Sequence, residues 1–215
     1  DTSKIAMPEV GIGFIPDVGG TFLLSRAPGL LGLHVALTGA PFTGADAIEL
    51  GFADHYVPHA HLEEFTADLI ADGVEHAVGA HAQEPPPSSL AAQREWIDHC
   101  YAGDTVTDIV AALREHEAGP AKDAADLIAT RSPIALAVTL AAVRRAAALP
   151  SLDEVLVQEY RVSCASLRSH DLVEGIRAQL VDKDRNPQWS PSSLASVTDG
   201  DVQAYFEPAD PDLTF

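Results

Sequence analysis

Two carboxylates lie near each other in the sequence, on either side of a glycine-rich segment. Glu9 and Asp17 are eight residues apart in PEVGIGFIPDVGG, residues 8–20, which holds four glycines and two prolines. So many backbone breakers exclude a regular helix or strand and favour an ordered loop that can fold back on itself. Both acids can then face one pocket, where one carboxylate serves as base or nucleophile and the other as acid or water-orienting group.

The spacing alone leaves a second interpretation open. Paired acids beside a loop of this kind also serve as a helix cap and a solvated surface charge. We expect Gly11, Gly13, Gly19 and Gly20 to supply left-handed conformations or close backbone approach, and so to shape the loop.

The charge balance of the chain excludes several classes of function. Thirteen Lys and Arg residues face thirty-two Asp and Glu residues, for a formal charge of -19. A surface this acidic repels nucleic acids and anionic lipid headgroups, so neither is expected as a partner. The longest apolar stretches, such as Ile134–Val143, are far shorter than the ~20 residues needed to cross a bilayer.

The cysteines and histidines show no metal-binding pattern. Cys100 and Cys164 are the two cysteines of the chain, and they lack the paired spacing of a zinc site. With no signal-like start, they indicate a reducing, cytoplasmic compartment and small buried side chains on helices. The histidines, among them His55, His59 and His61, show no repeated ligand spacing, so no metal site is predicted.

The loop must be positioned by short elements on its C-terminal side. Apolar periodicity and the Pro and Gly breakers predict strands at residues 4–7 and 53–57 and helices at residues 21–27, 32–37, 45–50 and 61–71. EPPPSS, residues 84–89, interrupts all periodicity and marks the main boundary, between residues 1–83 and 84–215.

The second part is predicted to be almost entirely helical. Helices are expected at residues 90–101, 106–116, 122–130, 134–149, 152–169, 172–180 and 199–206. Along residues 152–167 the apolar side chains recur at three- and four-residue steps and predict one buried face, made of Leu152, Val155, Leu156, Tyr160 and Leu167. This face needs a partner surface, either the first part of the chain or another subunit.

Two segments carry a resemblance to a known family. MPEVGIGFIPDVGGTFLLSRAPG, followed by ALTGAPFTGADAIELGFADHYVP, resembles the crotonase, or enoyl-CoA hydratase/isomerase, superfamily. The resemblance implies an α/β fold, the C-terminal portion of the crotonase spiral, predominantly helical in this chain. It also implies that Glu9, in the pair Pro8–Glu9, is an active-site glutamate, and that Pro8, Gly11, Gly13 and Ile15 contact the substrate.

Asp17 and the C-terminal segment narrow this resemblance. IPDVGG, residues 15–20, and QEYRVSCASLRSHDLVEGIRAQLVDKDRNPQW, residues 158–189, are similar to 3-hydroxyisobutyryl-CoA hydrolases, whereas ordinary hydratases tend to have glycine at the position of Asp17. The implied reaction is hydrolysis of a β-hydroxyacyl thioester to acid and coenzyme A, as in valine breakdown. Coenzyme A is part of the substrate, no separate cofactor is implied, and a homo-oligomer is the family habit.

The resemblance assigns roles to the two acids and leaves alternatives. Glu9 acts as nucleophile or general base, and Asp17 orients water or donates a proton; a mixed anhydride and direct water attack both fit. The two backbone N–H donors for the oxyanion are expected before residue 1, so residues 1–215 alone are expected to be inactive. Enoyl-CoA hydratase/isomerase chemistry and a catalytically silent assembly module are the rival functions.

Two other features of the C-terminal part have a structural and a functional interpretation. His170–Asp171 is compatible with a catalytic dyad, but residues of these types before Leu172 are expected to cap a helix. Eight of the thirteen basic residues lie between positions 131 and 185. They can bind the phosphates of coenzyme A, although ion pairing with the abundant acids is the favoured interpretation.

Overall fold

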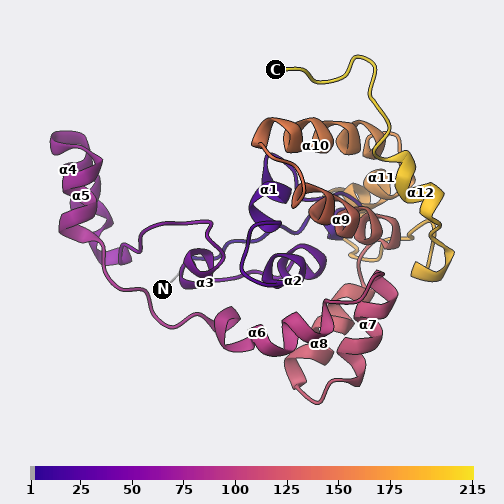
Figure 1. The fold of residues 1–215 in the computed structure, drawn as a ribbon, viewed down its shortest axis with the longest axis horizontal. Coiled ribbons are helices and arrows are strands. Elements are labelled where there is room, and N and C mark those ends of the chain that lie inside the picture. The colour runs from indigo at the N-terminus through magenta and orange to yellow at the C-terminus, as the bar shows by residue number, and fades with distance from the viewer. Residues whose placement is uncertain (1–2) are drawn as a thin grey trace.

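The computed structural model of the chain describes residues 3–215, and its regular elements are helices joined by irregular segments (Figure 1). Within the described residues the first half contains the 3₁₀ helices η1 (Glu9–Ile12) and η2 (His59–His61) and the α-helices α1 (Gly20–Leu24), α2 (Leu31–Thr38), α3 (Gly44–Glu49), α4 (Leu62–Asp72) and α5 (Val74–His81). The second half contains α6 (Ser89–Cys100), α7 (Val106–Glu115), α8 (Gly119–Ala129), α9 (Pro133–Ala146), α10 (Leu152–Ser166), α11 (His170–Ile176), the π-helix η3 (Arg177–Val181), the 3₁₀ helix η4 (Leu194–Ser196) and α12 (Asp199–Ala204).

Helix α2 lies at the centre of the core. All of its residues from Leu31 to Thr38 are buried, which is typical of a helix that is apolar all round. It packs against α6 and α8 on one side and against α1 and α9 on the other, as Figure 1 shows. One apolar cluster therefore joins residues before and after the predicted boundary at residues 83 and 84.

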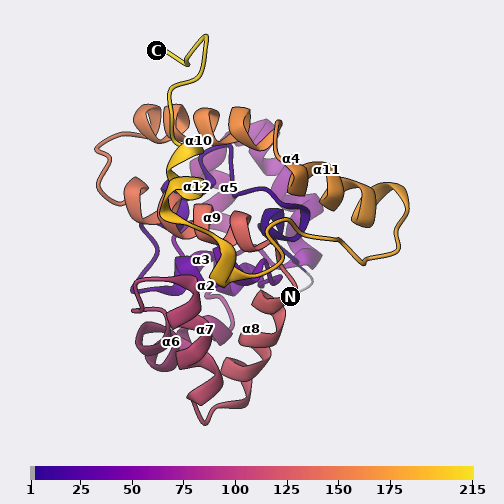
Figure 2. The same ribbon diagram turned by 90° about the vertical axis from the view of Figure 1, so that its right-hand side faces the viewer.

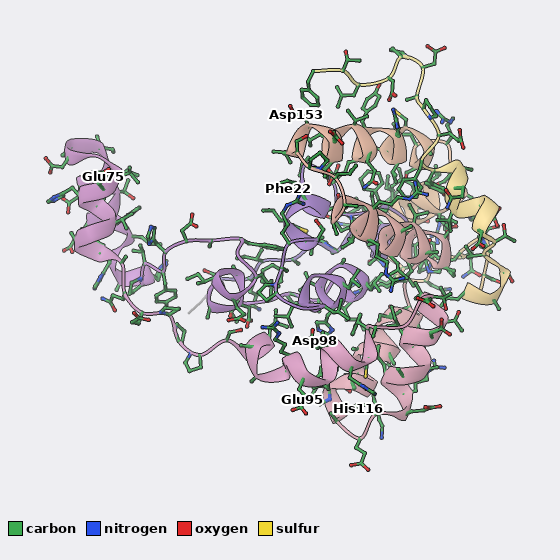
Figure 3. All side chains as sticks on the ribbon, viewed as in Figure 1. Phe22, Glu75, Glu95, Asp98, His116 and Asp153 are labelled. Atoms are coloured by element: carbon green, nitrogen blue, oxygen red, sulfur yellow. The ribbon has the colours of Figure 1, made fainter. Side chains whose placement is uncertain are left out.

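The hairpin of α4 and α5 extends away from this core (Figure 1). The chain enters and leaves it through two irregular segments, joined by an isolated bridge between Tyr56 and Gln83. Figure 3 labels Glu75 on this hairpin, far from the other labelled side chains. After it, α6 packs back onto α2 and α3. Division of the chain at residues 83 and 84 into separate units stays a prediction.

The predicted strands are wrong. Among the described residues, Ile5 pairs only with Phe42, and Tyr56 only with Gln83, each as an isolated bridge. Segments of four or five residues gain too few hydrogen bonds to form strands without a neighbouring sheet to extend. Helix α5 was not expected; Gly73, with φ 86°, ends α4 and begins α5, so that two helices follow each other where the sequence shows one clear period.

The second part of the chain, residues 84–215, packs on the first part, as the predicted apolar face requires. Helix α10 contacts α1 and α9, and its Val155 and Val162 are fully buried. The ends of the predicted face are wrong, because Leu152 is 43% and Leu167 71% exposed. A second apolar cluster, made of Ile15, Ile134, Val138, Ala142 and Val162, is covered by side chains of the tail.

The C-terminal tail returns over this second cluster. Helix α12 packs on α9 and lies on the viewer's side of it in Figure 2. The indole Nε1 of Trp189 donates to the carbonyl of Thr130 at 3.1 Å and fastens the preceding segment. No single helix in the described range is long and apolar enough to cross a bilayer; α8 and α9 reach that length only as a pair, bent by 116°.

Candidate active site

The loop begins with a short helix that places Glu9. In η1 the carbonyl of Glu9 accepts from the N–H of Phe14 at 3.0 Å, and Gly13 ends the turn in a left-handed conformation with φ 74°. A Cβ at Gly13 would lie 2.4 Å from the backbone of Asp171, so only glycine lets η1 approach α11 this closely. The C-terminal part of the chain therefore sets the position of Glu9.

The carboxylate of Glu9 is poorly solvated. Its Oε2 atom is buried and has no hydrogen-bond partner in the structure. Burial raises the pKa of Glu9 above its ordinary 4.5, the bond from its own backbone N–H opposes this, and the charge of Asp17 raises the pKa further. A carboxylate short of donors is a better base and nucleophile than a solvated one, which is the property that proton transfer or attack requires.

Asp17 is the second acid of this site. It is half-buried, and the structure brings it close enough to Glu9 for its charge to raise the Glu9 pKa. The backbone after Asp17 makes a tight turn, in which the N–H of Gly20 donates to the Asp17 carbonyl at 2.7 Å. Val18 and Gly19 are left-handed, with φ 52° and 87°. A β-branched residue rarely adopts this conformation.

The other predicted site residues mainly shape the loop. Pro8 is exposed and precedes η1, whereas Gly11 and Gly13 are buried. Gly11 lies against the guanidinium of Arg131, where an added Cβ would be 2.9 Å from Nη1. Ile15 is 1% exposed and belongs to the second apolar cluster. These placements give Gly11, Gly13 and Ile15 packing roles, and their contact with substrate stays a prediction.

A buried glutamate that the sequence did not single out also contacts the loop. Glu159 of α10 is 2% exposed. It accepts from the backbone N–H of Gly19 at 2.7 Å and of Thr21 at 2.9 Å, and from the Thr21 hydroxyl at 2.6 Å. Figure 3 shows Phe22 of α1 and Asp153 of α10 on the side where these helices meet. Glu159 lies one helical turn after Val155, on the same face of the helix. Because Val155 belongs to the predicted buried face, this spacing was the signal in the sequence that Glu159 is buried.

The capping role predicted for His170–Asp171 is wrong. Ser169 caps α11, its side chain accepting from the N–H of Leu172, and both predicted residues lie inside the first turn. Asp171 is 1% exposed and accepts from the Ser132 hydroxyl at 2.5 Å, from the N–H of Ser190 at 2.7 Å and from His170 at 3.0 Å. These contacts join α9, α11 and the tail, so the carboxylate is an anchor.

The basic residues of the C-terminal part are largely used inside the chain. Arg177 pairs with Glu174, Asp182 and Asp184, and Arg161 pairs with Asp212, as the ion-pairing interpretation predicts. Others donate to carbonyl or amide oxygens, as Arg131 does to Thr38, Arg144 to Gly103 and Asp104, and Arg145 to Gln203. Binding of coenzyme A phosphates by these residues stays a prediction.

Neither acid lines the cavity of about 460 Å³ that lies between α7, α9, η4 and α12. Two arginines of that cavity, Arg144 and Arg145, are the ones that already bind protein oxygens. In residues 3–215 no cluster of three or more His, Cys, Asp or Glu is arranged to hold a metal ion. Catalysis by Glu9 and Asp17 stays a prediction.

Comparison with known proteins identifies the family of this chain. The family model for enoyl-CoA hydratase/isomerase matches residues 1–206. The chain belongs to this family. A mitochondrial 3-hydroxyisobutyryl-CoA hydrolase of Danio rerio is 38% identical over 98% of this chain, and 3-hydroxyisobutyryl-CoA hydrolase 1 of Arabidopsis thaliana is 37% identical over 96%.

Solved structures of the family share the fold. A carnitinyl-CoA dehydratase from Mycobacterium thermoresistibile is 72% identical, with a TM-score of 0.97 over all of this chain. An enoyl-CoA hydratase from Rhodobacter sphaeroides is 38% identical, with a TM-score of 0.92. The crotonase fold expected from the sequence is thereby confirmed. The chain spans 58% of the length of both hydrolases and 62% of both solved chains.

Proposed function

We propose that the protein containing this chain is an acyl-CoA thioester hydrolase, with 3-hydroxyisobutyryl-CoA or a close β-hydroxyacyl-CoA as substrate. The observation that carries the proposal is the Glu9 carboxylate, which has one oxygen buried without a partner and a pKa raised by burial and by Asp17. The similarity to two 3-hydroxyisobutyryl-CoA hydrolases supports the choice of substrate.

The reaction adds water across the C–S bond of the thioester, giving a carboxylic acid and the thiol of coenzyme A. In one route Glu9 attacks the carbonyl carbon, the thiolate leaves, and water then hydrolyses the mixed anhydride. In the other route Glu9 takes a proton from the water that attacks the same carbon. In both routes Asp17 supplies a proton to the departing sulfur or orients the water. Both routes need an ionised Glu9.

Hydration or dehydration of an acyl-CoA is the second candidate. It is favoured by the 72% identity to a chain described as a carnitinyl-CoA dehydratase. In that chemistry water adds across a C=C bond and the thioester stays intact, so no thiol is released. The carboxylate pair suits it as well, because proton transfer at carbon also requires a base and an acid.

Thiol release decides between the two candidates. The full-length protein is incubated with 3-hydroxyisobutyryl-CoA and, separately, with a 2-enoyl-CoA, and free thiol and unsaturated thioester are measured in each reaction. The proposal expects one thiol per substrate consumed in the first reaction. Interconversion of enoyl and hydroxyacyl thioesters without thiol supports the second candidate and contradicts the proposal, as does the absence of any turnover.

A further inference from the structure

We propose that Glu159 is a positioning residue that holds Asp17 in place for catalysis, an inference that rests on the proposed function of the Glu9–Asp17 site. Glu159 lies 140 residues after Gly19 and 138 after Thr21 in the chain, yet its carboxylate receives three hydrogen bonds from these two residues. It does not contact the substrate in this account. It acts through the turn that follows Asp17.

The three bonds fill both oxygens of a buried carboxylate. Oε2 accepts from the N–H of Gly19 at 2.7 Å, and Oε1 accepts from the N–H and the hydroxyl of Thr21 at 2.9 and 2.6 Å. Gly19 is the N-cap residue of α1 and has no side chain to cap the helix. Glu159 therefore supplies from α10 the acceptor that α1 lacks in its own sequence, and its charge also suits a helix N-terminus.

The turn held in this way is strained. Val18 is β-branched and has φ 52°, a left-handed conformation that is strained for such a residue. Its side chain is 89% exposed, so its own packing does not offset the strain. The bonds from Glu159 to the backbone on the far side of Val18 can offset it. Without them the turn is expected to relax toward ordinary backbone angles.

Relaxation of the turn moves Asp17 first, because Val18 alone separates Asp17 from the anchored Gly19. The Asp17 carbonyl is tied to the N–H of Gly20 at 2.7 Å, so both ends of the turn are fixed in the native state. A shift of about 1 Å in a group that positions or protonates a substrate can cost ~10² in rate. The contribution of Glu159 is therefore expected in turnover more than in substrate binding.

The electrostatics of Glu9 provide a second sign of the same movement. Two causes raise the pKa of Glu9: burial, which is the larger, and the charge of Asp17. Glu159 is not among the causes. If the Asp17 carboxylate swings away, the pKa of Glu9 falls toward 4.5. The acid limb of the kcat/KM profile then moves to lower pH, as it should in Asp17→Asn. A merely structural role for Glu159 leaves this limb unmoved.

The test compares variants of the full-length protein at a temperature where each is fully folded. Glu159→Gln keeps the shape but replaces one of the two acceptor oxygens with an NH2 group, which cannot accept from the backbone. We expect kcat to fall about 10- to 10²-fold with little change in KM. The acid limb should move to lower pH. Thr21→Val, which removes only the hydroxyl donor at 2.6 Å, should lower kcat less, and Thr21→Ser should restore it.

Asp46→Asn is the matched control, because Asp46 is an equally buried carboxylate at the start of α3 that makes no contact with the loop. It should lower the melting temperature and leave kcat and the pH profile unchanged. The inference is overturned if Glu159→Gln and Thr21→Val keep wild-type kcat and pH profile while Glu9→Gln and Asp17→Asn lose activity. If Glu9→Gln and Asp17→Asn keep wild-type thiol release, the proposed function itself fails, and the inference falls with it.

Discussion

The loop at Glu9 and the junction between α3 and α6 each bury a carboxylate, and they treat it in opposite ways. Asp46, at the junction, is 1% exposed and accepts from the N–H and hydroxyl of Thr43, from the Ser88 hydroxyl and from the N–H of Leu90. Burial raises its pKa, but these bonds outweigh burial and lower the pKa to about 2. Glu9 has an oxygen without a partner, and its pKa is raised.

The two carboxylates differ in their supply of hydrogen-bond donors: Asp46, which we expect to be structural, has a full set, and Glu9, for which we propose a catalytic role, has an oxygen without a donor. Asp46 is held ionised by a capping box and by the N-terminus of α6, so its charge stabilises the fold. Glu9 has no such set of donors and faces a second negative charge. An unsatisfied buried group costs stability, and a protein retains such a cost where the group performs chemistry.

The largest expected effect is the loss of activity in Glu9→Gln. The amide has nearly the shape of the carboxylate but can neither attack the thioester nor accept a proton from water, so turnover should fall about 10³-fold. The measurement is steady-state thiol release by the full-length protein. Wild-type turnover in this variant would contradict a catalytic role for Glu9 and would leave no functional difference between Glu9 and Asp46.

Asp17→Asn should lower turnover about 10²-fold, because proton donation or water orientation is lost while Glu9 remains. The double variant Glu9→Gln/Asp17→Asn should be hardly slower than Glu9→Gln, since both groups act on one carbonyl. Measurement of the four enzymes in parallel gives the interaction. Strictly multiplicative losses would show that the two acids act at separate steps or sites.

Asp46→Asn should destabilise the fold by about 2 kcal/mol, since it replaces hydrogen bonds to a charged acceptor. The folded pKa of Asp46, about 2, lies below the ordinary 3.8, so its stabilisation is present above pH 3.8 and is lost as pH falls through about 2. Denaturant unfolding of wild type and variant at several pH values measures this. A constant difference at all pH values would contradict the assignment.

Glu9→Gln should stabilise the protein by about 1 kcal/mol at neutral pH, the reverse of the effect at Asp46, because a poorly solvated charge is removed. The folded pKa of Glu9 is raised, so its charge destabilises the native state above that pKa. The gain should shrink as pH falls through the raised pKa and vanish below 4.5, where the acid is protonated in both states. Destabilisation at neutral pH would show that the carboxylate has structural partners.

The sequence was informative where the signal is local. The glycines and prolines of residues 8–20 predict an irregular loop, and the structure departs from this only in the short 3₁₀ helix η1 at Glu9–Ile12. The loop brings Glu9 and Asp17 close enough for the charge of Asp17 to act on Glu9, as expected. The periodic helices of the second half are found within a few residues of their expected ends. The resemblance carried by Asp17 led to the hydrolase subfamily that the relatives support.

The sequence was uninformative where a residue acts across the chain. Glu159 looks like one more acid on an amphipathic helix, and only the fold reveals that its carboxylate binds Gly19 and Thr21. Asp171 looks like a helix cap, but Ser169 caps the helix and Asp171 binds Ser132 and Ser190. Such roles depend on long-range geometry that residue type and local periodicity do not encode.

The most direct test of the central claim is the titration of individual carboxyl groups by ¹³C NMR, with Glu9→Gln and Asp46→Asn used to assign the two resonances. Glu9 should titrate above 4.5, and its midpoint should fall in Asp17→Asn because a raising charge is removed. Asp46 should titrate near 2 in both proteins. A Glu9 midpoint at or below 4.5 that is unmoved by Asp17→Asn would contradict the account.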